Sequence, residues 1–166
     1  MGFPDESNTG VPPGVTLTPS DSITINTAGA VVSGLDIIGV LITAPNVTPE
    51  NCRVAATSWG GIVVQAPGAV IENRIYPNDN TKGVLFDDPA TGGVVRGCDI
   101  HDVEDEVYIS TTDIVVENYY IHDLKSTGFD PHYDGIQLHG GVSSDVTIHH
   151  NSVSEFPNSS TRGHDG

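Results

Sequence analysis

Two short sequence patterns recur along this chain at an interval of about 22 residues, and the interval limits what the chain can fold into. The first is a four-residue segment with two apolar residues separated by one position. It occurs at 39–42, 61–64, 83–86, 106–109 and 135–138, with offsets of 22, 22, 23 and 29 residues. The second ends in an apolar residue and occurs at 52–54, 73–75, 98–100, 119–121 and 151–153. Two patterns that share one period indicate that each repeat is one coil of a solenoid.

The segments inside each repeat have the character of short β-strands. They span three to six residues, are rich in Val and Ile, and are interrupted by Gly, Pro, Asn and Asp. No stretch combines a sustained helical period with helix caps. Short strands stacked about 4.8 Å above those of the previous coil form a right-handed parallel β-helix. We therefore predict an all-β fold of about six coils, with a lead-in segment at 1–20, a parallel β-helix domain at 21–156 and a polar tail at 157–166.

The second pattern also predicts what lies at one corner of successive coils. Asn73 shares this column with Cys52 and Cys98, and an Asn side chain can bond the backbone at a tight corner. The two cysteines are two coils apart, which is about 9–10 Å, whereas a disulfide needs Cα atoms within about 7 Å. We predict two buried, reduced thiols.

The charge balance excludes several classes of partner. Asp and Glu number 22 against 6 Lys and Arg, which gives a net charge of −16. This balance argues against binding of nucleic acid or of anionic membranes and, more weakly, of polyanionic sugars. No apolar run approaches 18 residues, so we expect no membrane span. The first five residues lack a basic and apolar leader, so we expect no signal peptide there.

A repeated His-Asp pair is the first candidate for chemistry. His101-Asp102 and His122-Asp123 are 21 residues apart, so we expect His to stack on His and Asp on Asp. Two carboxylates one coil apart repel, which raises one pKa, and an adjacent His can shuttle the proton. The alternative interpretation is structural, with each Asp serving as a turn residue that closes a corner. Both interpretations stay open at this point.

A longer loop, residues 125–134, accounts for the offset of 29 in the first pattern. Long loops on a rigid solenoid often carry function. We expect this loop and the strand after it to meet the second His-Asp pair on one edge. The candidate catalytic residues are therefore His101, Asp102, His122, Asp123, Asp130, His132, Asp134 and His139.

Several chemistries can be tested against these residues. A glycoside hydrolase needs two carboxylates about 5–10 Å apart, which the Asp residues could provide. They could also hold Ca²⁺, and we expect no other cofactor. A polyuronate lyase or epimerase needs an Arg for proton abstraction, but Arg53, Arg74 and Arg96 are expected to lie coils away. No His or Cys spacing is typical of a zinc site.

Apolar side chains also fall at outward positions of the first pattern. These positions, which we call the outward stripe, are occupied by Leu41, Val63, Leu85, Tyr108 and Gln137. Four stacked apolar side chains should not face water. Either the N-terminal segment around 11–13 covers them, or another subunit does.

The coil pattern over residues 20–155 resembles the pectate-lyase-like superfamily of right-handed β-helices. Two narrower segments, GFPDESNTGVP at 2–12 and HYDGIQLHGG at 132–141, resemble β-helix domains of secreted actinobacterial proteins and minor tail proteins of phages that infect actinobacteria.

The resemblance implies two functions. The first is a bacteriophage virion component, a β-helical minor tail protein or tail-fibre module that engages host cell-envelope glycans. Tail proteins of this kind imply trimeric packing along the outward stripe, or contacts with other virion proteins. The second is a secreted carbohydrate-active enzyme, a glycoside hydrolase or polysaccharide lyase, that uses the Asp and His cluster. Either function places the protein in the virion or outside the cell.

Overall fold

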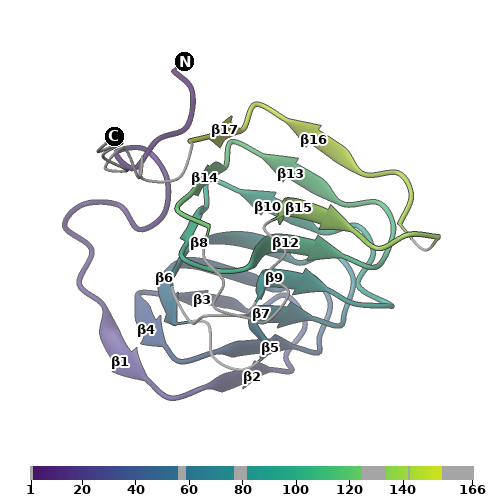
Figure 1. The fold of residues 1–166 in the computed structure, drawn as a ribbon. Helices are drawn as coiled ribbons and strands as arrows, with labels where there is room; N and C mark the ends of the chain where they lie inside the picture. Colours follow the sequence, from purple (N-terminus) through teal and green to yellow (C-terminus); the bar gives the residue numbers. More distant parts are fainter. Residues whose placement is uncertain (1, 56–58, 77–81, 125–133, 142, 155–166) are drawn as a thin grey trace, which may run out of the picture.

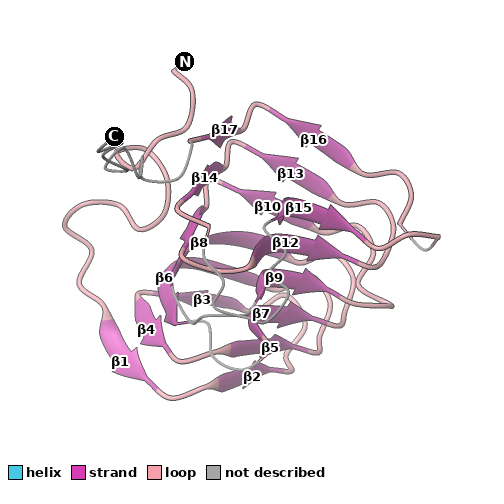
Figure 2. Ribbon diagram, in the orientation of Figure 1, coloured by secondary structure: helices cyan, strands magenta, loops and turns pink. Residues whose placement is uncertain are grey.

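The computed structural model describes residues 2–55, 59–76, 82–124, 134–141 and 143–154. These residues form strands joined by turns, without a helix in the described part (Figure 2). No helix that could span a membrane is found among them. The strands are β1 (Thr18–Ser20), β2 (Ile23–Ile25), β3 (Val31–Ser33), β4 (Leu35–Ile37), β5 (Val40–Ile42), β6 (Thr48–Ala55), β7 (Gly60–Val64), β8 (Val70–Tyr76), β9 (Lys82–Phe86), β10 (Val94–Arg96), β11 (Asp99–His101), β12 (Asp105–Ile109), β13 (Val115–Glu117), β14 (Tyr120–His122), β15 (Asp134–Leu138), β16 (Thr147–His149) and β17 (Ser152–Val153).

The strands stack coil upon coil into a right-handed parallel β-helix, which confirms the predicted fold (Figure 1). One face is a sheet in the order β15-β12-β9-β7-β5-β2. The other strands of the described part form a second sheet, which covers two faces because the long strands β6 and β8 turn a corner. At one end β8 pairs with β10, and at the other end it pairs with β11. The predicted limits of the lead-in segment, domain and tail stay a prediction.

The predicted register is confirmed in both columns. The first pattern pairs in parallel from coil to coil through Val40, Ile62, Val84, Val107 and Ile136. The second pattern pairs through Val54, Ile75, Ile100, Ile121 and Val153. Most of these apolar residues are fully buried, so the stacked positions form one continuous core.

The corner column is held by buried side chains, as predicted. Asn73 accepts a hydrogen bond from the backbone N–H of Cys52 and donates one to the carbonyl of Pro49, each 2.9 Å long. Cys52 and Cys98 are buried and not bridged. Burial raises the pKa of the Cys98 thiol to about 12, which keeps it protonated.

The outward stripe is covered only in part. Leu85 is buried, whereas Leu41, Val63 and Tyr108 are half-buried. The N-terminal segment lies on a different face, where Gly10 contacts β8 and β11. Of the two alternatives, cover by the N-terminal segment is therefore wrong, and cover by a second subunit stays a prediction.

One polar pair lies inside the core. Glu106 occupies the column of Gly83 and Gly135, where an added Cβ would contact the inward side chains of Ile100 and Ile121. Strict alternation would turn this column outward, yet the Glu106 side chain is fully buried. The Glu106 carboxylate therefore points inward and accepts a hydrogen bond from the Tyr119 hydroxyl.

The environment of Glu106 disfavours its charged form. The side chain is fully buried, and this burial raises its pKa well above the usual value. The charges of Asp99 and Asp123 act in the same direction, while the Tyr119 hydrogen bond opposes them. A carboxyl group with a raised folded-state pKa contributes stability that is fully present below its unfolded pKa, about 4.3. This stability is lost as pH rises through the folded-state pKa.

We predict that Glu106→Gln stabilises the protein above neutral pH. Glutamine keeps an acceptor for the Tyr119 hydroxyl but cannot ionise. The difference in unfolding free energy between variant and wild type should be small near pH 4 and grow towards pH 8, by about 1.4 kcal/mol for each unit of pKa shift. Urea denaturation across this range measures it. Glu6→Gln, at an exposed glutamate, controls for the loss of one negative charge. A difference that stays constant with pH would contradict the prediction.

Candidate functional site

The outward face of β8, β11 and β14 positions the candidate site. Ile75 of β8, Ile100 of β11 and Ile121 of β14 point into the core. The residues directly before and after each of them therefore point outward. The outward residues before the middle position are Arg74, Asp99 and Tyr120, and those after it are Tyr76, His101 and His122.

The two His-Asp pairs stack as predicted. The rings of His101 and His122 lie 4.8 Å apart between centroids, with an interplanar angle of 26°. In each pair the imidazole Nδ1 is 2.8 Å from Oδ2 of the following Asp. The backbone N–H of Asp102 also donates to the carbonyl of Asp123, 3.0 Å away.

Both aspartates of these pairs also act as turn residues. Asp102 and Asp123 have φ angles of 57° and 53°, in the left-handed region that Asp tolerates better than most residues. The turn interpretation is thus supported by the backbone, while the carboxylates additionally orient the rings of His101 and His122. Their predicted catalytic role stays a prediction.

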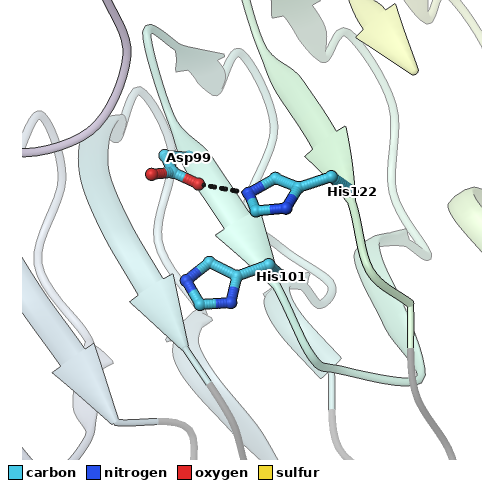
Figure 3. Close-up of side chains that lie close together, drawn as sticks. All are labelled: Asp99, His101 and His122. Atoms are coloured by element: carbon cyan, nitrogen blue, oxygen red, sulfur yellow. Dashed lines mark hydrogen bonds and ion pairs between the residues drawn. The ribbon is translucent and has the colours of Figure 1, made fainter. Parts of the chain in front are cut away.

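Asp99 completes this site, and the sequence analysis did not single it out. Its Oδ1 is 2.9 Å from Nε2 of His122, as Figure 3 shows, and its Oδ2 is 2.6 Å from a guanidinium nitrogen of Arg74. The Asp99 side chain is only 2% exposed. A buried carboxylate held by a guanidinium and an imidazole is an ordered, fixed charge.

The N-terminal segment explains how an outward carboxylate becomes buried. The backbone N–H of Gly10 donates to the carbonyl of Gly97, 2.7 Å away, which holds the segment against β11. A Cβ at position 10 would lie 2.9 Å from the Cβ of Asp99 and 3.3 Å from that of Arg74. Gly10 has φ of +72°, so both its backbone and its contacts require glycine.

The remaining predicted residues are not all brought to this site. Asp134 begins β15 and pairs with Asp105, which follows the short turn after His101. His139 lies beyond the other end of β15, where its ring is 6.0 Å from that of Tyr108 and not beside His122. Asp130 and His132 lie outside the described residues.

A second acidic position, Asp105, was also missed. It is 4% exposed, and its Oδ2 is 3.6 Å from Nζ of Lys82. Burial raises the pKa of Asp105, and the neighbouring charges of Glu104 and Asp134 add to this effect, while Lys82 opposes it. The first pattern could have indicated this group, since Asp105 and Asp134 each stand directly before it.

The histidine column continues towards the first coils and ends there in a hollow. The register places Tyr76, Ala55 and Ile38 in the outward column that ends in His101 and His122. The small Ala55 leaves a hollow of about 410 Å³ between Ile38 and Tyr76. We call the hollow, together with this column of five residues, the lateral groove.

Charged residues border the groove. Asp36 pairs with Arg53, whose Nε lies 2.9 Å from the Asp36 carboxylate. The Arg53 guanidinium also lies 5.3 Å from the centre of the Tyr76 ring, which it helps to orient. Asp21 lines the hollow as well.

We predict that Gly10→Ala detaches the N-terminal segment from β8 and β11. The new methyl would clash with Asp99, and the left-handed backbone adds strain, so a loss of about 1–3 kcal/mol is expected. Urea denaturation measures the loss, and limited proteolysis reports release of the segment. Gly14→Ala is the matched control, because Gly14 has φ of +89° but no atom within 4 Å of its added Cβ. Equal effects of the two variants would show that the contact with Asp99 contributes nothing.

Comparison with known proteins agrees with this geometry. A family model described as a right handed beta helix region matches residues 14–161. No curated protein and no solved structure matches the chain. The matched region includes both stacked columns, the His-Asp pairs and the lateral groove, and the chain therefore belongs to the right-handed beta helix family.

Proposed function

We propose that this domain binds a cell-envelope glycan along the lateral groove. The observation that carries the proposal is one outward column with a hollow of about 410 Å³ at one end and three ring-bearing side chains along the rest. The column runs across the strands, so its side chains repeat about every 4.8 Å. An extended polymer of ring-shaped units suits such a surface better than a compact ligand does.

The rings supply suitable chemistry for sugars. Tyr76 is half-buried, and its ring is oriented by Arg53. The stacked His101 and His122 continue the column, and the Tyr120 ring lies 4.4 Å from that of His122. The rings of His101, His122 and Tyr120 stack on one another and so offer their edges to a ligand, while Tyr76 is the ring proposed to stack on a sugar. The polar groups beside them provide hydrogen bonds that fix the orientation of the ligand.

The charges narrow the class of glycan. Asp21 and Asp36 line the hollow, and the whole chain carries a net charge of −16. This field repels uronate or sulfate groups and tolerates neutral or amino-sugar units. A neutral or cationic envelope polysaccharide is therefore the proposed ligand.

We predict that Tyr76→Ala weakens glycan binding at least tenfold while leaving the fold intact. Calorimetric titration with soluble neutral and amino-sugar polysaccharides measures the affinity. Phe3→Ala is the control, because Phe3 is an exposed aromatic residue that stacks on His150, outside the lateral groove and the outward stripe. An equal loss in both variants, or no binding by the wild type, would contradict the proposal.

The proposed setting is the tail of a virion, where the domain acts as a trimer or with other virion proteins. Support comes from the resemblance of the 2–12 and 132–141 segments to phage tail proteins and from unburied apolar surface. Leu41 and Val63 are half-buried, and Leu138 and Val153 near the last coil are 48% and 71% exposed. Light scattering should find a stable oligomer, and Leu41→Lys should dissociate it. A wild-type protein that is monomeric at high concentration would remove this support.

Glycan cleavage is the second candidate, and the Asp105 and Asp134 pair favours it. The two residues are paired across neighbouring coils, and burial raises the pKa of Asp105. An acid with a raised pKa beside a second carboxylate is the arrangement that glycoside hydrolysis uses. Release of reducing ends from a bound glycan, abolished by Asp105→Asn, separates cleavage from binding alone.

A further inference from the structure

We propose that Asp99, His101 and His122 form a binding site for a divalent transition-metal ion of the zinc type. One candidate ligand atom from each residue lies within 4.8 Å of the other two. Figure 3 shows that the carboxylate and the two rings come from neighbouring strands and lie on the same outward face. The site shares His101 and His122 with the lateral groove, but the metal titration that tests it does not require glycan binding.

The hydrogen bonds around both rings suit metal ligation. Nδ1 of His101 is 2.8 Å from the Asp102 carboxylate, and Nδ1 of His122 is 2.8 Å from the Asp123 carboxylate. An ionised carboxylate accepts a hydrogen bond from Nδ1–H, and in that neutral tautomer the opposite nitrogen, Nε2, can offer its lone pair to a metal. A carboxylate behind each ligating His also fixes the orientation of the ring.

The pair of Asp99 and His122 is already close to ligand spacing. Oδ1 of Asp99 is 2.9 Å from Nε2 of His122, where a shared proton joins them. Two ligands at about 2.1 Å from a tetrahedral ion are separated by about 3.4 Å, so an ion can replace that proton after a small opening. The candidate ligand atom of His101 lies within 4.8 Å of the other two, so a small shift of this side chain brings the third ligand in.

Charge and access agree with a divalent cation. The carboxylates of Asp99, Asp102 and Asp123 surround the rings, and the Arg74 guanidinium offsets one of them. The remaining two negative charges balance the two positive charges of the ion. Asp99 is only 2% exposed, but the His101 and His122 side chains are 22% and 15% exposed, so an ion can enter past the rings.

The ligand types select the class of ion. Two imidazoles with one carboxylate suit Zn²⁺, Co²⁺ or Ni²⁺, whereas Ca²⁺ and Mg²⁺ prefer an all-oxygen shell. Three protein ligands leave a fourth position for water. The Ca²⁺ site considered from the sequence is a different site from this one, since it would be built from Asp residues alone.

Calorimetric titration of the full chain with Zn²⁺ tests the site. We expect one ion per chain, a melting temperature that rises with Zn²⁺, and intense visible absorption bands on substitution with Co²⁺. Ca²⁺ at the same concentrations should produce neither heat nor a melting shift. His101→Gln should weaken Zn²⁺ binding at least tenfold. Among the described residues, His101 makes the Asp102 hydrogen bond and the ring stack with His122. The variant should therefore retain the fold, as far-UV circular dichroism would show.

His149→Gln is the matched control. Nε2 of His149 lies 3.1 Å from the Glu117 carboxylate on an exposed part of the surface, outside the proposed site. Binding that persists in this variant and is lost in His101→Gln supports the proposal. Absence of saturable Zn²⁺ binding by the wild type, or equal binding by wild type and His101→Gln, overturns it. Glycan binding measured with and without a chelator then shows separately whether the proposed function stands.

Discussion

The parallel hydrogen-bonding of each coil to the next is the interaction on which the whole molecule depends. It holds every position of one coil about 4.8 Å from its equivalent in the neighbouring coils. Inside the solenoid this spacing stacks Val and Ile side chains into one core. At the corner it lets Asn73 bond the backbone of the coil before it. An insertion or deletion of one residue in a strand would therefore shift the residues of the core, the corner and the outer surface out of register together.

The same constraint determines the outer surface. Because equivalent positions of neighbouring coils share one register, the side chains of His101 and His122 must lie side by side. The surrounding residues then determine whether this contact is favourable. Asp102 and Asp123 hold the far side of each ring, and Asp99 bonds His122 from the neighbouring strand. The outward column that contains these rings is also the one that leaves a hollow at Ala55. The lateral groove and the cluster of Asp99, His101 and His122 both result from the parallel pairing of these strands.

Interactions that follow from the period could be predicted from sequence. The register of both columns, the stacking of the two histidines and the unbridged cysteines all depend only on which residues lie one coil apart. Features that depend on a break in regularity could not be predicted. Glu106 points inward to the Tyr119 hydroxyl, whereas strict alternation along its strand gives the opposite direction.

The burial of Asp99 could not be predicted from the sequence either, for a different reason. The spacing of Arg74, Asp99 and His101 puts them on one face, but nothing in the repeat tells which segment covers that face. The covering segment lies outside the repeats, and its contact depends on Gly10. The need for glycine at this position becomes evident only from the structure, which places Asp99 and Gly97 beside it. Contacts between a repeat and a non-repeating segment carry no periodic signal.

The contact of Gly10 with β8 and β11 has a consequence for how the molecule comes apart. In a solenoid each coil touches only its neighbours, so coils can in principle unravel one after another from either end. Here a segment that precedes the first coil crosses to Arg74 and Asp99, several coils further along the axis. The first coils cannot leave without either releasing this segment or disrupting the middle of the stack. The N-terminal segment thus joins early and middle coils into one cooperative unit, in a fold whose architecture otherwise favours piecemeal melting.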